Sequence, residues 1–175
     1  LERRDYQQEA VDTILRDKKV LIKASTGAGK TVIATEAMRS ARTQINLIVA
    51  PLNTVKGWRD TLQRQDIGEL RFIDNRKAGK LAMYDLMNEV PGYYFMGYER
   101  ARTLHWAKIA LDFVVFDEVH RCANHKSQTA KLMRTMKHSE YTVALSATPA
   151  GNKPSGLFGV ARTIWDDPCG HGSFW

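Results

Sequence analysis

The stretch "ASTGAGKT" carries residues whose types and spacing could bind a phosphate. It runs from Ala24 to Gly29, Lys30 and Thr31 and fits the pattern [AG]-x-x-x-x-G-K-[ST]. Small residues let successive backbone N–H groups surround an anion, and a helix that begins there points its positive end at the same anion. In such a loop Lys30 reaches the β- and γ-phosphates and the Thr31 hydroxyl binds Mg²⁺. The residues predicted to hold a nucleotide are Ser25, Thr26, Gly27, Ala28, Gly29, Lys30 and Thr31. The alternative is an ordinary glycine-rich turn, but the strand pattern before it and the helix pattern after it favour a nucleotide site.

The stretch "FVVFDEVHRCANH" places Asp117 and Glu118 directly after four apolar residues. Ligands of parallel sheets gather at the carboxyl ends of the strands, so both acids would lie near the phosphate loop. We predict that Asp117 holds Mg²⁺, through water, and that Glu118 orients and deprotonates an attacking water molecule. An Asp-Glu pair alone would indicate only a solvated turn. The preceding strand and the loop at Lys30 favour catalysis.

The same stretch offers nitrogen and sulfur ligands, and a zinc site is the alternative use of them. However, His120, Cys122 and His125 lie too close together for the usual paired spacing of zinc ligands, and no clear second pair follows. Cys169 and His171 occur only in the irregular tail "DDPCGHGSFW". We therefore predict no metal ligation by these side chains.

Short apolar runs predict the strands that position these motifs. The runs are "KVLIKA", "INLIVA", "LRFID", "YYFMG", "DFVVFD" and "TVALSA". A first helix is predicted from a stripe formed by Tyr6, Ala10, Val11, Ile14 and Leu15. A second should begin at the phosphate loop, and others are predicted near residues 55–62, 80–88, 126–137 and 155–165. Buried strands that alternate with helices indicate an α/β fold, with a mostly parallel sheet covered on both faces.

The composition is that of an ordinary soluble globular protein with one sizeable core. No apolar run approaches the roughly 20 residues that cross a bilayer, so we expect no membrane partner. The formal charge of +7 suggests a polyanionic partner only weakly. Two cysteines form no disulfide framework, and the start "LERRDYQQEA" shows no signal-peptide pattern. We expect an intracellular protein (cytoplasmic, or nuclear if the source is eukaryotic) or an excised piece of one.

Several motifs together resemble a known family. "YQQEA", "ASTGAGKT", "VAPLNTVKGW", "DEVH" and "SATP" stand in the order found in the first motor domain of superfamily-two helicases and translocases. The resemblance is of the DExH-box type and covers nearly all 175 residues. From "GYERA" onward the chain is most similar to the Swi/Snf-like branch, although "SAT" departs from the glycine-containing form usual there. The resemblance implies a RecA-like P-loop NTPase fold, with residues 1–175 as a single N-terminal ATP-binding domain.

The resemblance also implies roles that spacing alone does not assign. Gln7 would read adenine, with Gln8 as the less favoured substitute, and His120 would couple the nucleotide site to a third motif. That coupling motif consists of Ser146, Ala147 and Thr148. The residues implied to contact the nucleic-acid backbone are Pro51, Asn53, Thr54, Tyr98 and Arg100. Plainer alternatives remain, since Thr54 could simply begin a helix and Trp58 is interpreted as a residue that packs in the core or in a groove.

The function implied is that of the first motor domain of an ATP-dependent nucleic-acid helicase or translocase. Its catalytic residues would be Lys30, Asp117, Glu118 and His120. The expected cofactors are ATP and Mg²⁺, and the expected partner is DNA, in preference to RNA, contacted mainly through its backbone. A second RecA-like domain, absent from this chain, would supply an arginine finger, so the isolated chain should be weakly active or inactive. The alternative is a P-loop ATPase or kinase acting on a small molecule or protein, which leaves Gln7, "VAPLNTVKGW" and "SATP" without a role.

Overall fold

A six-stranded sheet forms the centre of the molecule in the computed structural model, which describes residues 4–106, 109–124, 126–136, 139–149 and 154–165. The strands are β1 (Lys19–Lys23), β2 (Ile45–Val49), β3 (Leu70–Phe72), β4 (Gly92–Met96), β5 (Phe113–Asp117) and β6 (Tyr141–Ser146). Their order across the sheet is β1-β6-β5-β2-β4-β3, and every neighbouring pair is parallel. Each strand predicted from an apolar run is confirmed, as is the α/β class.

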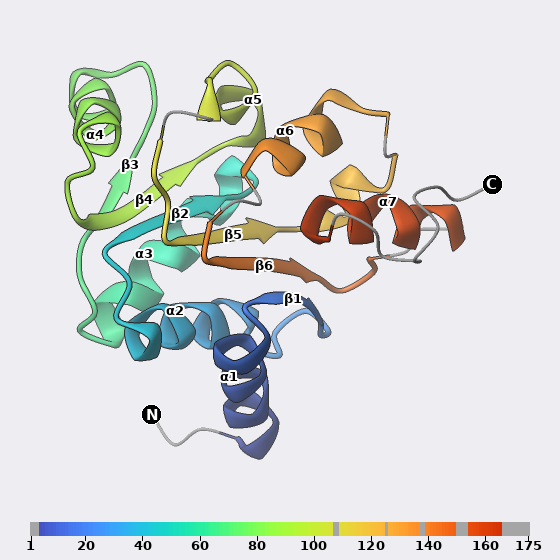
Figure 1. Cartoon of the computed structure of the whole chain (residues 1–175). Helices are drawn as coiled ribbons and strands as arrows, with labels where there is room; N and C mark the ends of the chain where they lie inside the picture. The colour runs from blue at the N-terminus through green and yellow to red at the C-terminus, as the bar shows by residue number, and fades with distance from the viewer. Residues whose placement is uncertain (1–3, 107–108, 125, 137–138, 150–153, 166–175) are drawn as a thin grey trace.

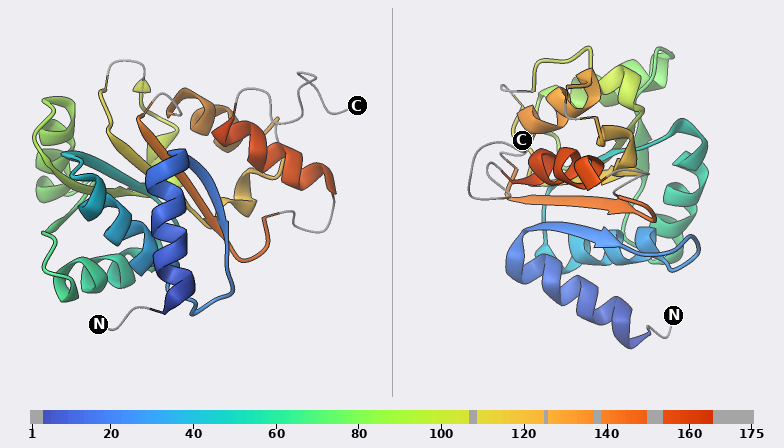
Figure 2. Two further views of the ribbon diagram at one scale, coloured as in Figure 1. Left: turned by 60° about the horizontal axis from the view of Figure 1, so that its bottom comes forward. Right: turned by 90° about the vertical axis from the view of Figure 1, so that its right-hand side faces the viewer.

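Helices cover both faces of the sheet, as predicted. One face is covered by α1 (Asp5–Asp17), α2 (Lys30–Ala41) and α3 (Val55–Arg64). The other is covered by α4 (Lys77–Met87), α5 (Tyr98–Ala101), α6 (Gln128–Met136) and α7 (Pro154–Ile164). Figure 1 shows the first group below the sheet and the second group above it, and Figure 2 shows α1 and α7 on opposite sides of β1 and β6. Short 3-10 turns, η1 (Leu52–Thr54) and η3 (Val119–Cys122), follow β2 and β5.

The predicted helices differ from the observed ones mainly at their ends. The largest shift is at α4, which begins at Lys77 and not at Lys80. Asp74 Oδ1 accepts the backbone N–H of Arg76 at 2.9 Å, and this side-chain turn starts the helix one turn earlier. The short elements α5 and η3 were not predicted, because a single turn contains too few residues to show a helical period.

The alternation of side chains along β5 assigns its residues to two cores. Val114 and Phe116 pack in the layer with α4 to α7, whereas Phe113 and Val115 pack in the layer with α1 to α3. Both faces are buried, which explains why the strand is apolar at successive positions. By the same alternation, the next side chain, that of Asp117, points toward the α1–α3 layer.

The carboxyl ends of the parallel strands bring distant motifs to one edge of the sheet. In the register of the sheet, Lys23 lies opposite Ser146, and Asp117 lies opposite Leu145. The segments that leave the sheet at this edge are residues 24–29, 51–54, 73–76, 97–98, 117–118 and 146–148. They contain most of the residues singled out from the sequence, and Lys30, Thr31, Arg100 and His120 lie within two residues of them, so this edge is the candidate site.

Within the described residues, no helix combines the length and apolar character needed to span a bilayer. Those residues also contain no group of three or more His, Cys, Asp or Glu side chains arranged to hold a metal ion. Cys122 is buried, and burial raises the pKa of its thiol to about 12. His125, Cys169 and His171 lie outside the described residues, and the prediction that they bind no zinc stays a prediction.

Candidate active site

The phosphate loop turns on two glycines before α2 begins. Gly27 and Gly29 both have φ of +82°, a left-handed conformation that glycine adopts without steric cost. Gly29 directly precedes α2, whose first residue is Lys30. The Lys30 Nζ donates hydrogen bonds to the carbonyl oxygens of Ala24 (2.9 Å) and Ser25 (3.2 Å). The loop therefore combines a helix N-terminus with a cation whose hydrogen bonds, among the described residues, go to neutral carbonyl oxygens, an arrangement that suits a phosphate.

The start of α1 lies against this loop. Gln7 Nε2 and the Tyr6 hydroxyl both donate to the Ala28 carbonyl oxygen, at 3.2 and 2.9 Å. A Cβ atom at position 29 would meet the flexible end of the Gln7 side chain, which would have to move; the left-handed backbone of Gly29 is what favours glycine there. Gln8 is exposed. The structure thus brings Gln7, and not Gln8, to the loop, and adenine recognition by Gln7 stays a prediction.

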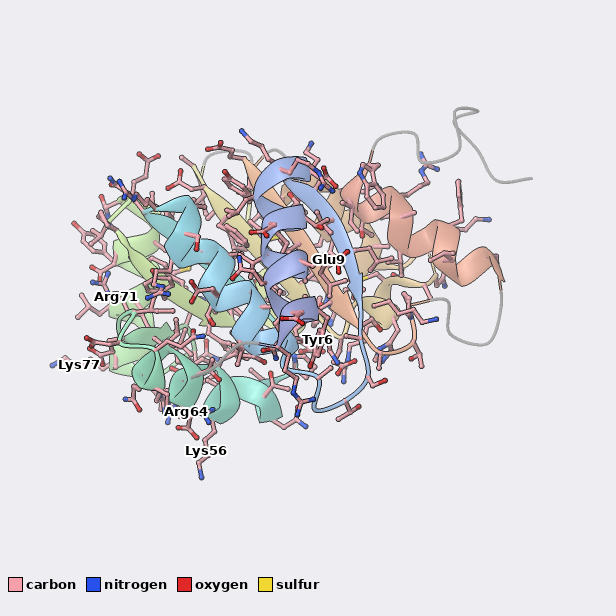
Figure 3. The ribbon with its side chains drawn as sticks, turned by 90° about the horizontal axis from the view of Figure 1, so that it is seen from below. Tyr6, Glu9, Lys56, Arg64, Arg71 and Lys77 are labelled. Carbon is pink, nitrogen blue, oxygen red and sulfur yellow. The ribbon has the colours of Figure 1, made fainter. Side chains whose placement is uncertain are left out.

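Tyr6 departs from the predicted helical stripe. Val11 and Ile14 of that stripe are buried, and Ala10 and Leu15 pack against the core, but Tyr6 is 42% exposed. Its hydroxyl instead donates to the phosphate loop, at the Ala28 carbonyl oxygen. Figure 3 shows Tyr6 near the beginning of α1.

Asp117 ends β5 with its carboxylate held on both oxygens. Oδ1 accepts the backbone N–H of Glu118 at 2.9 Å, and Oδ2 accepts the indole N–H of Trp58 at 3.1 Å. The residue is 7% exposed, and this burial raises the pKa of the carboxyl, while the Trp58 hydrogen bond lowers it. Glu118 has a left-handed backbone (φ 54°, ψ 48°), which turns the chain sharply out of the strand. Both acids nevertheless line one cleft.

A cleft of about 460 Å³ joins the loop to the acids. Its lining includes Gly29, Lys30, Thr31, Asn53, Thr54, Trp58, Asp117 and Glu118. Thr31 and Asp117 thus share one cleft and offer a hydroxyl and a carboxylate, the oxygen donors that Mg²⁺ prefers. The donor set fits a magnesium ion bound together with a nucleotide.

A chain of contacts leads from Glu118 to the end of β6. His120 Nδ1 lies 3.2 Å from Glu118 Oε2 and 3.5 Å from the Ser146 hydroxyl. Ser146 Oγ accepts the backbone N–H of Thr148 at 3.1 Å. Ala147 is half-buried between them and contributes no polar side chain. The imidazole therefore bridges the second acid and the "SAT" segment, and the coupling role stays a prediction.

The segment after β2 presents residues at the same edge. Thr54 does not cap α3 with its side chain, because its hydroxyl donates back to the Pro51 carbonyl oxygen at 2.8 Å. Asn53 is exposed beside it. These three residues, predicted to contact a nucleic-acid backbone, form one surface turn next to the cleft.

The segment after β4 is placed differently from expectation. Tyr98 is only 2% exposed, and its hydroxyl donates to the Asp117 carbonyl oxygen at 2.6 Å. Burial raises the pKa of this hydroxyl well above its ordinary value, so it remains a donor. Arg100 is half-buried, and its Nε has no hydrogen-bond partner among the described residues. Of this pair, only Arg100 reaches the surface in the structure; the Tyr98 side chain lies in the interior.

The burial of Trp58 was predicted from the sequence, but its contact with Asp117 was not. Its burial (1% exposed) agrees with a packing role. The hydrogen bond to Asp117 was not foreseen, because 59 positions separate the two residues. One signal was present: a buried tryptophan N–H usually finds an acceptor, and Trp58 lies in the first turn of the helix that follows β2.

Comparison with known proteins places this geometry in a family. The family model described as "Type III restriction enzyme, res subunit" matches residues 1–151. A curated relative, the DNA 3'-5' translocase XPB2 of Sulfurisphaera tokodaii, is 29% identical over 153 residues, which cover 85% of this chain and 31% of that protein. The chain thus spans about a third of that relative's length.

Solved structures share the fold. The SWI2/SNF2 ATPase core of Sulfolobus solfataricus in complex with dsDNA superposes with a TM-score of 0.81 at 19% identity, covering 99% of this chain and 37% of that one. The UvsW helicase of bacteriophage T4 gives 0.74 at 17% identity, covering 94% and 58%.

These matches confirm the resemblance predicted from the motifs, while the choice of the Swi/Snf-like branch stays a prediction. The chain has the RecA-like fold of a superfamily-two motor domain and belongs to the family of the type III restriction enzyme res subunit.

Proposed function

We propose that this chain is the first motor domain of an ATP-dependent DNA helicase or translocase. The observation that carries the proposal is the single cleft that contains Lys30, Thr31, Asp117 and Glu118. The relatives support it, since they include a DNA 3'-5' translocase, a helicase and an ATPase core bound to dsDNA.

The residues of the cleft divide the chemistry of ATP hydrolysis among them. Lys30 and the N–H groups that precede it bind the phosphates, and Thr31 and Asp117 hold Mg²⁺. When bound, Mg²⁺ supplies positive charge to the phosphate oxygens. The Glu118 carboxylate orients a water molecule and accepts its proton. His120, in contact with Glu118, links this step to Ser146 and the segment that follows.

DNA would bind along the same edge of the sheet. The residues at the surface that would contact DNA are Pro51, Asn53, Thr54 and Arg100. Tyr98 is buried and would not contact DNA directly. Contacts of this kind bind phosphates and carry little sequence information. We therefore expect binding that weakens steeply as salt increases and that prefers no particular sequence.

A complete motor requires a second RecA-like domain against the cleft. An arginine finger from such a domain raises hydrolysis by about three to five orders of magnitude. We therefore expect the chain by itself to bind Mg²⁺–ATP weakly and to hydrolyse it slowly. Because ATP and DNA are its substrates, we place the protein inside the cell.

The test measures ATPase activity of the complete protein that carries this domain, with and without double-stranded DNA. We expect DNA to stimulate hydrolysis and Glu118→Gln to abolish it without loss of nucleotide binding. Glu140→Gln is the matched control, because Glu140 is exposed, pairs with Lys18 at 2.7 Å, and precedes β6 at the opposite edge. A rate of ATP hydrolysis that neither DNA nor RNA changes would favour the ATPase or kinase alternative. Hydrolysis that continues in the Glu118→Gln variant would refute the assignment of the base.

A further inference from the structure

We propose that Trp58 and Tyr98 form a two-sided clamp on Asp117 that couples DNA binding to the magnesium-holding carboxylate. The inference rests on the proposed function and deepens it. The two aromatic residues are positioning residues, since neither would touch the nucleotide or the DNA itself. The clamp consists of two hydrogen bonds, one to the Asp117 side chain and one to its main chain.

Trp58 sets the orientation of the carboxylate. Asp117 points toward the layer of α3, where the Trp58 ring is buried and donates its N–H to Oδ2 at 3.1 Å. The backbone N–H of Glu118 holds the other oxygen at 2.9 Å. With one donor on each oxygen, rotation of the carboxylate is restricted. A shift of α3 therefore changes how Asp117 faces the cleft.

Tyr98 holds the same residue from the other layer. Its ring packs in the core under α4 to α7, whereas the Trp58 ring packs in the core under α1 to α3. Its hydroxyl donates to the Asp117 carbonyl oxygen at 2.6 Å. The two aromatic side chains thus reach Asp117 from opposite faces of the sheet and fix both its backbone and its side chain.

Each arm of the clamp belongs to a segment proposed to contact DNA. Trp58 lies four residues after Thr54, which is about one helical turn. Tyr98 lies two residues before Arg100 on α5. If DNA binding displaces either segment, the displacement therefore also moves the aromatic side chain that holds Asp117.

The two segments also touch each other. Leu52 Cδ2 would lie 2.8 Å from a Cβ atom at Gly97, so η1 packs directly on the start of α5. At the strand ends, the Ala50 N–H donates to the Met96 carbonyl oxygen at 3.1 Å. The backbone hydrogen bond and the Leu52 contact, which lies at the surface because Leu52 is 54% exposed, tie the two segments together. The segments are therefore expected to move together when DNA binds.

The plain alternative is that each aromatic residue merely satisfies a buried donor. The chain provides matched controls for this. Trp106 is 4% exposed and its indole N–H donates to the Ala101 carbonyl oxygen at 2.9 Å. Tyr94 is fully buried and its hydroxyl donates to the Val90 carbonyl oxygen at 2.6 Å. Removal of the Trp106 N–H costs a bond to an uncharged acceptor, and removal of the Tyr94 hydroxyl also costs the bond that it accepts from Arg71 at 2.9 Å; neither side chain hydrogen-bonds Asp117.

The experiment compares Trp58→Phe and Tyr98→Phe with Trp106→Phe and Tyr94→Phe in the complete protein that carries this domain. Two quantities are measured by equilibrium binding. One is the Mg²⁺ concentration for half-maximal binding of a non-hydrolysable ATP analogue. The other is the coupling factor, the ratio of DNA dissociation constants without and with that Mg²⁺–analogue.

Trp58→Phe should raise the half-saturating Mg²⁺ concentration about tenfold, the scale of a hydrogen bond to a charged group. It should also bring the coupling factor close to one, while DNA affinity without nucleotide changes less than about twofold. Tyr98→Phe should change the half-saturating Mg²⁺ concentration and the coupling factor in the same directions, by about threefold, because the Tyr98 hydroxyl donates to an uncharged carbonyl oxygen. The two control variants should leave both quantities within about twofold of wild type.

Different outcomes separate the two proposals. Equal shifts for Trp58→Phe and Trp106→Phe, or wild-type coupling in the Trp58 variant, would overturn the clamp and leave the proposed function intact. If the DNA affinity of the wild-type protein is the same with and without nucleotide, the proposed function is overturned and the clamp with it. If Trp58→Phe fails to fold, 3-(3-benzothienyl)alanine at position 58 keeps the ring shape and lacks the N–H, and the same shifts are expected.

Discussion

Two clefts of similar size differ in the state of their charges. One is the active-site cleft of about 460 Å³; the other, which we call the edge cleft, has about 510 Å³ and lies between β3 and α4. The edge cleft is richer in charged side chains, with Arg59, Glu69, Arg71, Asp74, Arg76 and Asp85 in its lining. Charge content and volume alone would favour the edge cleft as a ligand site.

The charges of the edge cleft largely neutralise one another. Arg71 lies 3.5 Å from Asp85 and also donates to the Tyr94 hydroxyl at 2.9 Å. Arg76 pairs with Asp74. In the active-site cleft, by contrast, no salt bridge joins Lys30 or Asp117 to an opposite charge within the described ranges; neutral carbonyl and N–H groups hold them. A charged group that is hydrogen-bonded by neutral groups still attracts a ligand of opposite charge. The charge of a group in an ion pair is largely offset by its partner.

Lys30→Ala should give the largest effect and is the most direct way to break the comparison. Loss of the cation should weaken Mg²⁺–ATP binding roughly 100-fold, because a charge-assisted contact to phosphate is among the stronger hydrogen bonds. Calorimetric titration of the chain with nucleotide measures this. Arg71→Ala in the edge cleft is the control and should change affinity less than about twofold. Equal losses in the two variants would show that the clefts do not differ as argued.

Asp117→Asn should raise the Mg²⁺ requirement of nucleotide binding by about tenfold or more, since a neutral amide oxygen binds a divalent cation weakly. Nucleotide binding without Mg²⁺ should change little. A Mg²⁺ titration with a fluorescent nucleotide separates the two effects. Asp85→Asn removes a carboxylate from the edge cleft and should leave the titration unchanged; a shift there would contradict the assignment of the site.

Gln7→Ala should weaken ATP binding by about tenfold and reduce the preference for ATP over GTP, if its amide reads the base. Gln7 Oε1 also accepts the Arg4 N–H at the start of α1 (3.3 Å), so a stability loss of about 1 kcal/mol should accompany it. Competition between the two nucleotides measures the preference. Gln8→Ala, on the exposed side of α1, should alter neither quantity.

Arg71→Ala should have the smallest effect, on stability alone. Its ion pair with Asp85 is about a third exposed, and such pairs contribute at most about 1 kcal/mol. Urea unfolding followed by circular dichroism measures the change. A loss of several kcal/mol would mean that the edge cleft carries an unrecognised structural role and would weaken the contrast between the two clefts.

Much of the fold was predictable because its signals are local. A strand buried on both faces must be apolar at successive positions, and "FVVFD" shows this directly. Glycine at positions 27 and 29 allows a left-handed backbone, and the helix begins at the lysine that follows. The single turns α5 and η3 were not predictable, because four residues are too few to show a repeating helical pattern.

The side-chain contacts at the site were predictable only in part. Tyr98 was expected to face nucleic acid, since its segment follows a strand at the correct edge. Whether a tyrosine beside a strand end turns outward or inward depends on the neighbouring strand, and here the Asp117 carbonyl oxygen lies within reach of its hydroxyl. No pattern within the "GYERA" segment specifies that acceptor.

The sequence by itself determined the parallel α/β fold, the phosphate loop and the two acids, because buried strands, glycine conformations and charged residues at strand ends are written in short stretches. Only the tertiary structure decided that Gln7 lies on the loop, that His120 bridges Glu118 and Ser146, and that Trp58 and Tyr98 hold Asp117. Those contacts join residues from separate strands, helices and turns. They exist because a parallel sheet collects the carboxyl ends of its strands at one edge.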